Sequence, residues 1–465
     1  MSEYKATIGL EIHAELKTKT KMFCDSKNDP EEEKPNMNTC PVCMAHPGTL
    51  PVINKAAVKH VLRVGKALKG NIADFTEFDR KNYFYPDIPK GYQISQYKYP
   101  LVSGGELAGV EITRVHLEED TATSKHDKGD HSLVDFNRAG VPLMELVTEP
   151  VVRDAEQAMM FAKELQLLLR YLGAGDANME KGEMRVEANI SVSKTDTFGT
   201  KVEVKNLNSF KIVAKAIEYE IERQIKEIES GGEIVQETRG WDEAKQKTFS
   251  QRIKESSDDY RYFPDPDLPK LKISEIEEFQ NLELPELPWE KRERYRKEFG
   301  IKDEDIESFI IDEHLAKYFE DVISVFNGDK NLIKLASNYI TSDLVGLTKA
   351  GFPHPDHSQL AELVLMVSKN EISSRGAKEI LKILVEDGGN ARDIAEEKGL
   401  FQKSDEGEIK KIVEQIISEN QSAADEYRAG KEASLKFLIG QGMRATKGSA
   451  NPQVLEKIFV EVLSK

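Results

Sequence analysis

One charged residue lies inside an otherwise apolar run. Glu145 occupies the middle of Val141–Val147, where hydrophobic side chains would point to both faces of a β-strand. This pattern is typical of a strand that is covered on both sides, so the Glu145 carboxylate is predicted to be buried. A lone buried charge costs several kcal/mol unless a cation or a proton compensates it. The fold must therefore bring a compensating partner to this strand.

Two further segments carry acids and a histidine that can share this environment. Ile8–Glu15 alternates between apolar and polar residues, so Glu11 and His13 would lie on one face of a strand. Val115–Asp120 also ends an apolar strand in acids. Acidic and imidazole ligands from several strands suit a hard divalent cation, so the three segments predict a metal-dependent active site. The alternative interpretation is a solvent-facing acid and histidine pair on one strand.

Composition narrows the class of protein. The 465 residues exceed what one hydrophobic core usually supports, so two or three domains are expected. No apolar run approaches the roughly 20 residues of a membrane helix, and a predicted strand that begins by Ile8 leaves no room for a signal peptide. Three cysteines are too few for a disulfide framework. We therefore expect a cytoplasmic multidomain protein.

The charge distribution limits how the chain can contact nucleic acid. A net charge of −17 argues against non-specific coating of nucleic acid, because phosphate contacts need clustered lysine and arginine. The last 36 residues, 430–465, oppose this trend with six basic residues against three acidic ones. Any nucleic-acid contact is therefore expected to be confined to a local basic region, such as residues 430–465.

The pattern of elements changes along the chain. Residues 1 to about 270 mix strand-like segments with two helices, predicted from Asp154 to Leu172 and from the cap Ser209 to Gly231, which favours an α+β class. Prolines crowd residues 260–288 and mark a boundary. The remainder is predicted to be all-α, with helix-start signals at Ser358, Ser373, Asn390, Ser422 and Asn451–Pro452.

The sequence contains no phosphate-binding loop of the Gly-x-x-x-x-Gly-Lys-Ser/Thr type. A bound nucleotide would therefore have to be anchored by Mg²⁺ that carboxylates hold. Arg80, Lys81 and Lys90 lie in one proline-containing segment, Asp79–Lys90, and could neutralise phosphoryl oxygens. The alternative is a sheet edge with aromatic packing and solvated charges.

The three cysteines form a loop-separated pattern that is similar to a zinc clip. Cys24 precedes the Cys40-x-x-Cys43 pair, and either Asp25 or His46 could supply a fourth ligand. Three packed or free thiols are the competing interpretation. The sequence also lacks an embedded Ser-Ser-Lys or Cys-His-Glu motif for releasing ammonia from glutamine. If the protein uses ammonia, a partner must supply it.

Seven motifs in order along the chain resemble those of the B subunits of the aspartyl/glutamyl-tRNA(Asn/Gln) amidotransferase family. They extend over residues 8 to 270, and the helical remainder is similar in length and pattern. The motifs are Gly9–His13, Cys40–Cys43 with Pro47–Pro51, Asp79–Gln96, His116–Asp120, Phe136–Leu143, Lys205–Phe210 and Asp259–Pro264.

The resemblance implies a fold and a reaction. It implies a glutamine-synthetase-like cradle over residues 1–290, a helical domain over 291–403 and a tRNA-proximal helical tail over 404–465. ATP would phosphorylate the side-chain carboxylate of Glu on tRNA(Gln) or of Asp on tRNA(Asn), and ammonia would displace the phosphate. The catalytic residues would be Glu145, Glu119, Lys81 and Arg80, the ATP-binding residues Arg80, Lys81 and Lys90, and the Mg²⁺ ligands Glu11, His13, Glu119 and Glu145.

The same resemblance implies partners. A glutaminase (amidase) subunit would supply ammonia through a channel, and a small third subunit would brace the pair in a heterotrimer. Lys436, Arg444 and Lys447 are expected to contact tRNA phosphates, against the alternative of a solvated helix face. The chain departs from the zinc-bearing form of the family at Ser26, where a further cysteine is common. Two other functions stay open, a non-catalytic tRNA-binding scaffold and a ligase for a free amino acid.

Overall fold

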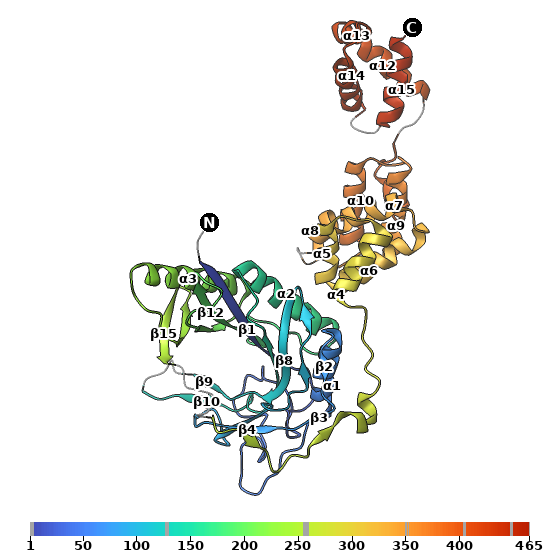
Figure 1. The fold of residues 1–465 in the computed structure, drawn as a ribbon. Helices are drawn as coiled ribbons and strands as arrows, with labels where there is room; N and C mark the ends of the chain where they lie inside the picture. Colours follow the sequence, from blue (N-terminus) through green and yellow to red (C-terminus); the bar gives the residue numbers. More distant parts are fainter. Residues whose placement is uncertain are drawn as a thin grey trace. The chain divides into compact units, whose positions relative to one another are not determined.

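The computed structural model describes residues 4–125, 130–253, 260–348, 351, 353–402, 406–446 and 450–464. The chain divides into two compact units, Met1–Pro288 and Trp289–Lys465. Strands dominate the first unit and helices the second (Figure 1), so the α+β class predicted from the sequence is confirmed. Among the described residues, no helix has the length and apolar composition to cross a membrane.

A ten-stranded sheet organises the described part of the first unit, in the order β15-β14-β13-β12-β1-β11-β8-β6-β2 with β7 beside β8. All of its pairings are antiparallel except that of β13 with β14. Its strands are β1 (Lys5–Glu15), β2 (Asn71–Ile72), β6 (Val102–Ser103), β7 (Glu106–Leu107), β8 (Val110–Glu119), β11 (Pro142–Thr148), β12 (Met184–Ser193), β13 (Val202–Leu207), β14 (Glu237–Asp242) and β15 (Lys247–Ile253).

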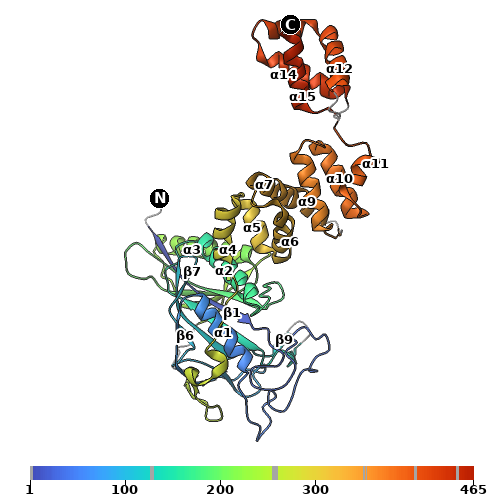
Figure 2. The ribbon, with the colours of Figure 1, turned by 90° about the vertical axis from the view of Figure 1, so that its right-hand side faces the viewer.

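Three helices pack on this sheet. Helix α1 (Lys55–Ala67) contacts β2, β6 and β8, α3 (Phe210–Glu229) contacts β12, β13 and β15, and α2 (Ala155–Tyr171) packs against α3 and β7. Figure 2 shows α1 beside β6. The side chains of Asp154 and Ser209 cap α2 and α3 by accepting backbone N–H groups, so both predicted helices are confirmed near their predicted bounds.

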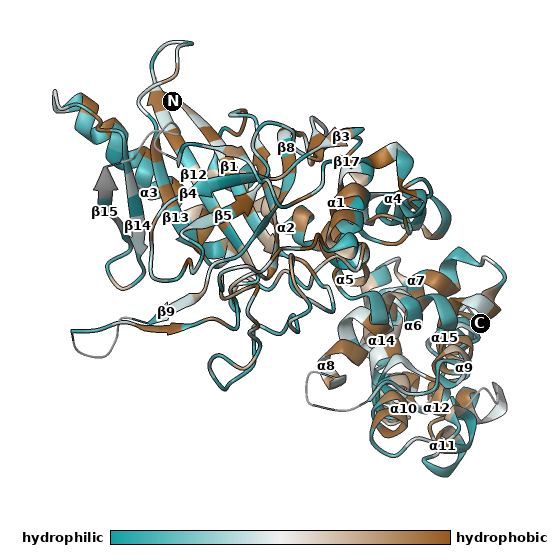
Figure 3. Ribbon diagram, turned by 90° about the horizontal axis from the view of Figure 1, so that it is seen from below, coloured by the Kyte–Doolittle hydropathy of each residue, from teal (hydrophilic) through white to brown (hydrophobic). Residues whose placement is uncertain are grey.

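Alternation along β1 separates the core from the polar side of the sheet. The side chains of Ile8, Leu10, Ile12 and Ala14 are completely buried, as the two-residue period predicted. Brown and teal alternate along the strands of this sheet in Figure 3. The residues between them, including Glu11 and His13, therefore face the other side.

Smaller sheets complete the described part of the first unit. Strands β16 (Phe263–Pro264), β4 (Asp79–Asn82) and β5 (Tyr92–Ser95) form one of them, in that order, and β5 contacts β8. The other two pair β9 (Thr123–Lys125) with β10 (Leu133–Asp135), and β3 (Phe75–Thr76) with β17 (Leu271–Lys272). The sheet of β4 and β5 brings the predicted phosphate-binding segment to the end of β8.

The described part of the second unit is helical, as predicted, apart from an isolated bridge between Ile372 and Phe401. Residues 409–463 contribute a core of their own, built from α12 to α15. The helices are α4 (Pro288–Arg294), α5 (Asp303–Ile311), α6 (Glu313–Ile323), α7 (Lys330–Asn338), α8 (Val345–Thr348), α9 (His357–Ser368), α10 (Ser374–Glu386), α11 (Ala391–Glu397), α12 (Glu406–Glu419), α13 (Gln421–Arg428), α14 (Glu432–Ala445) and α15 (Pro452–Leu463).

Three of the five predicted helix starts are confirmed, because Ser373, Asn390 and Asn451 cap α10, α11 and α15 with their side chains. The other two were wrong. Asp356 caps α9 in place of Ser358, and Ser422 lies inside α13. Aspartate and serine are both preferred at the N-cap, and here Asp356 accepts the backbone N–H of Ser358.

Candidate active site

Three neighbouring strands bring the predicted acids and histidines together. His13 on β1 lies opposite Glu145 on β11, which in turn lies opposite His116 on β8. Directly opposed residues of antiparallel strands project to the same face, so these side chains converge. Glu145 is only 7% exposed, which confirms the burial predicted from its apolar neighbours.

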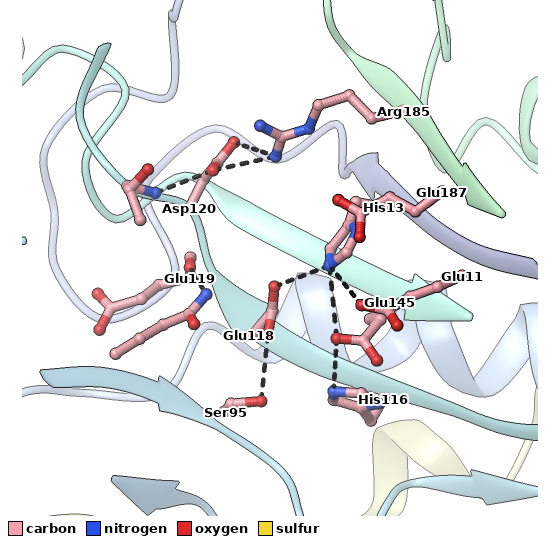
Figure 4. A network of polar contacts seen from close by, with 12 residues as sticks. Glu11, His13, Ser95, His116, Glu118, Glu119, Asp120, Glu145, Arg185 and Glu187 are labelled. Carbon is pink, nitrogen blue, oxygen red and sulfur yellow. Dashed lines mark hydrogen bonds and ion pairs between the residues drawn. The ribbon is translucent and has the colours of Figure 1, made fainter. Parts of the chain in front are cut away.

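His13 lies at the centre of the carboxylates (Figure 4). Its Nε2 atom is 3.4 Å from Glu145 Oε2, 3.5 Å from Glu118 Oε1 and 4.0 Å from Glu11 Oε1. The ligand atoms of Glu11, His13 and Glu145 all lie within 4.8 Å of one another, as do those of His116, Glu118 and Glu145. The sequence therefore predicted correctly that Glu11, His13 and Glu145 meet.

Glu145 links the two groups of ligand atoms. Its Oε2 is 3.5 Å from His116 Nε2, and its Oε1 accepts a hydrogen bond of 3.3 Å from Arg114. His116 is 3% exposed, and its Nδ1 has no hydrogen-bond partner among the described residues. The sequence interpretation did not assign His116, although its spacing from Glu118 places both on one face of β8.

Burial and mutual charge shape the titration of this cluster. Burial and the neighbouring Glu145 raise the pKa of Glu118 to about 7, and burial with Glu145 and Glu187 raises that of Glu11. Burial alone would lower the pKa of His13, but Glu145 and Glu118 raise it to about 9. The carboxylates therefore repel one another in a dry environment, which favours the binding of a cation.

The surroundings shift the pKa values of His13 and His116 in opposite directions. Burial lowers the pKa of His116 to about 4, so this ring is neutral at physiological pH. The pKa of Glu145 lies well below its usual value against the effect of burial, because His116, His13 and Arg114 surround the carboxylate. A neutral imidazole beside an ionised carboxylate is a suitable pair of donors for a divalent metal.

Glu118, and not the predicted ligand Glu119, joins the acidic cluster. Glu118 is 3% exposed, accepts a hydrogen bond of 3.2 Å from Ser95 Oγ and lies 3.5 Å from His13 Nε2. Glu119 points away from His13 in Figure 4 and pairs with Lys90 at 2.5 Å and with the backbone N–H of Ile94 at 2.9 Å. The described geometry thus places Glu118, and not Glu119, beside Glu145.

The predicted phosphate-binding residues diverge. Lys81 on β4 lies over the rings of Tyr83 and Tyr260, and although burial opposes it, the charge of Glu118 raises the pKa of Lys81. Arg80 points elsewhere, with ion pairs of 2.8 Å to Asp265 and 3.0 Å to Asp267. Of these predicted phosphate-binding residues, Lys81 is therefore the one whose charge acts on the acidic cluster.

A third acidic group extends the cluster towards β12 and β13. Ligand atoms of Glu11, Glu187 and Glu203 lie within 4.8 Å of one another, and Lys205 Nζ is 2.8 Å from Glu187. The sequence interpretation did not assign Glu187 or Glu203. Glu187 lies directly opposite Glu11, and the alternation of residue types along Met184–Ser193 was the sequence signal that could have identified it.

Comparison with known proteins assigns the chain to a family. Residues 6–278 match the GatB/GatE catalytic domain, and residues 317–463 match the GatB domain. The chain belongs to the GatB/GatE family. Relatives named as the B subunit of an aspartyl/glutamyl-tRNA(Asn/Gln) amidotransferase include that of Persephonella marina, which is 45% identical over 99% of this chain and 100% of the relative.

Other relatives carry the same name. The protein of Caldanaerobacter subterraneus subsp. tengcongensis is 45% identical over the full length of both chains, and that of a Picosynechococcus species is 43% identical over 99% of this chain and 98% of the relative. Membership in the GatB/GatE family, which the seven motifs predicted, is thus confirmed over both units.

The cysteines of this GatB/GatE member converge as well. The sulfur atoms of Cys24, Cys40 and Cys43 lie within 4.8 Å of one another, and among the described residues neither Asp25 nor His46 joins this group. All three are free thiols in the structure. The predicted fourth zinc ligand is therefore not supplied by either candidate.

The predicted tRNA contacts lie on the last helices. Lys436 and Arg444 belong to α14 and are exposed, whereas Lys447 lies outside the described residues, as does Asp259 of the seventh motif. Phe437, next to Lys436, is 48% exposed. The described part of this helix therefore offers cationic and aromatic groups to solvent.

Proposed function

We propose that this chain is the subunit of an aspartyl/glutamyl-tRNA amidotransferase that activates and amidates the misloaded amino acid. The substrate is Glu-tRNA(Gln), Asp-tRNA(Asn) or both. A carboxylate is a poor acceptor for an amine, so one oxygen must first become a leaving group. The γ-phosphoryl group of ATP passes to the side-chain carboxylate, ADP leaves, and ammonia then attacks the carbonyl carbon and releases phosphate and a proton.

The convergence of Glu11, His13 and Glu145 on adjacent strands carries this proposal. The donors fit Mg²⁺, because the carboxylates of Glu11 and Glu118, whose pKa values are raised, lie with Glu145 around the imidazole of His13. Glu11, His13, Glu145 and, in place of Glu119, Glu118 would hold the ion. When bound there, Mg²⁺ would supply positive charge next to the phosphoryl group that is transferred.

The chain's own residues prepare the site for a triphosphate. Lys81 adds a half-buried positive charge that interacts with Glu118 and can neutralise a phosphoryl oxygen. Arg114 and Ser95 donate hydrogen bonds that orient the carboxylates of Glu145 and Glu118. Glu118 and Glu145 are 3% and 7% exposed, and this exclusion of water strengthens each of these interactions.

Partner proteins would complete the reaction. No motif for glutamine hydrolysis is present in the sequence, so ammonia would come from a glutaminase (amidase) subunit, with a small third subunit completing a heterotrimer. Residues 1–290 would form the catalytic cradle, 291–403 a helical domain and 404–465 the tail that contacts tRNA through Lys436, Arg444 and Lys447. Because its substrate is an aminoacyl-tRNA, we place the complex in the cytoplasm.

An amidation assay tests the proposed function. The reconstituted complex is given each misacylated tRNA, ATP and Mg²⁺, with glutamine or with ammonium chloride as the nitrogen source. We expect ATP-dependent amidation from both sources, and only ammonium-dependent amidation when the glutaminase partner is left out. Binding of tRNA without any metal-dependent phosphorylation would support the scaffold function, and amidation of free glutamate would support the amino-acid ligase.

A further inference from the structure

Three thiols and a buried lysine meet at one side of the cradle. The sulfur atoms of Cys24, Cys40 and Cys43 lie within 4.8 Å of one another, and Cys43 Sγ accepts the backbone N–H of Cys40 at 3.1 Å. Lys21 is completely buried, and its Nζ lies 3.9 Å from Cys43 Sγ and 3.1 Å from the carbonyl oxygen of Phe136. A buried ammonium group needs a nearby negative charge. Cys43 is the ionisable side chain that its amino group contacts.

This arrangement differs from a closed zinc site. A structural zinc ion needs four donors, usually sulfur or nitrogen. Here three sulfur atoms converge, and the Ser26 hydroxyl lies 3.7 Å from Cys43 Sγ. Lys21 brings its positive charge to the same sulfur atom, that of Cys43. In a zinc site, the metal ion would neutralise the negative charge of this thiolate. The group therefore has the composition of a reactive thiol pair beside a fixed cation.

A cavity of about 170 Å³ gives small molecules access to two of the three thiols. Cys24, Cys43, Lys90 and Glu119 all line this cavity. Cys40 does not line it. The volume is sufficient for a molecule as small as hydrogen peroxide, since one water molecule occupies about 30 Å³ in the liquid.

We propose that Cys24 and Cys43 form a reversible disulfide when the protein meets a peroxide. The Cys43 thiolate attacks one peroxide oxygen, the O–O bond breaks, and hydroxide leaves with a proton as water. The Cys24 sulfur then attacks the resulting sulfenic acid, an S–S bond forms, and a second water is released. The two thiols lose two electrons and two protons, and the peroxide is reduced to two waters.

The position of the pair suggests what the disulfide would change. Lys21 Nζ binds the carbonyl oxygen of Phe136, and Met22 donates its backbone N–H to Gly140 at 2.7 Å. Residues 136–140 lead directly into β11, which carries Glu145. Movement of the thiols would therefore affect the start of β11 and the cavity that Lys90 and Glu119 also line. We expect the oxidised protein to amidate more slowly, with recovery after reduction.

Mass spectrometry of the full chain tests the proposal without tRNA or ATP, so its outcome is independent of the proposed function. The reduced protein is treated with hydrogen peroxide, blocked with iodoacetamide and digested without reductant. We expect a peptide pair joined through Cys24 and Cys43 that dithiothreitol separates. Cys24→Ser and Cys43→Ser should each abolish that linkage, whereas Cys40→Ser, the matched control, should retain it.

Two further measurements complete the test. Metal analysis of the reduced protein should find zinc well below one equivalent per chain. Lys21→Met should oxidise about tenfold more slowly at neutral pH, because the cation beside Cys43 is lost. The proposal is overturned if the peroxide-treated chain lacks the Cys24–Cys43 linkage, or if the reduced chain holds one zinc ion that protects the thiols.

Discussion

Glu145→Gln tests the chemistry of the cluster with the smallest change in shape. The substitution keeps the volume of the side chain and removes one negative charge from a position that is 7% exposed. In the native protein this charge faces His13 at 3.4 Å, His116 at 3.5 Å and Arg114 at 3.3 Å. The variant should therefore fold while it loses much of its attraction for a divalent cation.

The magnitude follows from the geometry. Two unit charges 4 Å apart interact with about 4 kcal/mol at an effective dielectric constant of about 20. Each 1.4 kcal/mol of lost transition-state stabilisation is about tenfold in rate. If one such interaction is lost from the transition state, Glu145→Gln should lower the rate about a thousandfold.

The assay is ATP hydrolysis that depends on misacylated tRNA, measured in the reconstituted complex over a range of Mg²⁺ concentrations. The matched control is Glu111→Gln, which makes the same chemical change at an exposed position of β8. The control should retain the native rate. A rate for Glu145→Gln within threefold of the native rate, at every Mg²⁺ concentration, would refute the proposed role of the cluster.

Three other predictions concern neighbouring parts of the chain. Glu118→Gln should raise the Mg²⁺ concentration for half-maximal amidation by tenfold or more, and Glu119→Gln should leave it unchanged; equal effects would contradict the placement of the two side chains. Glu220→Ala should lower the temperature of thermal unfolding, because this completely buried carboxylate is paired with arginines and such losses cost about 3–5 kcal/mol; an unchanged melting temperature would count against it. Charge removal at Lys436 and Arg444 should weaken tRNA binding and reduce the salt slope by about 2, as measured by filter binding in increasing salt; an unchanged slope would leave them as solvated side chains.

The strands that carry the site were largely predictable from the sequence. Strict alternation defined the buried face of β1, and apolar residues on both sides of Glu145 predicted its burial. Register was not predictable. The pairing of His13 with Glu145 joins residues more than a hundred positions apart, and nothing in either strand fixes which residues oppose each other.

The hydrophobic pattern did not predict which of two adjacent acids joins the acidic cluster. Glu118 and Glu119 are both buried at the end of β8, so hydrophobicity does not distinguish the face that each one occupies. His116 held the necessary signal, since a residue two positions later shares its face. Arg80 shows a second limit, because its partners Asp265 and Asp267 follow it by more than 180 residues and only the folded chain brings them together.

The location of a bound divalent cation tests the account most directly. A crystal of the chain grown with Mn²⁺ and a non-hydrolysable ATP analogue would reveal the ion by its anomalous scattering. We predict a peak within coordination distance of Glu11, His13, Glu118 and Glu145, with phosphoryl oxygens on its open side. A metal and nucleotide bound elsewhere, with His13 still in contact with Glu145, would contradict the account.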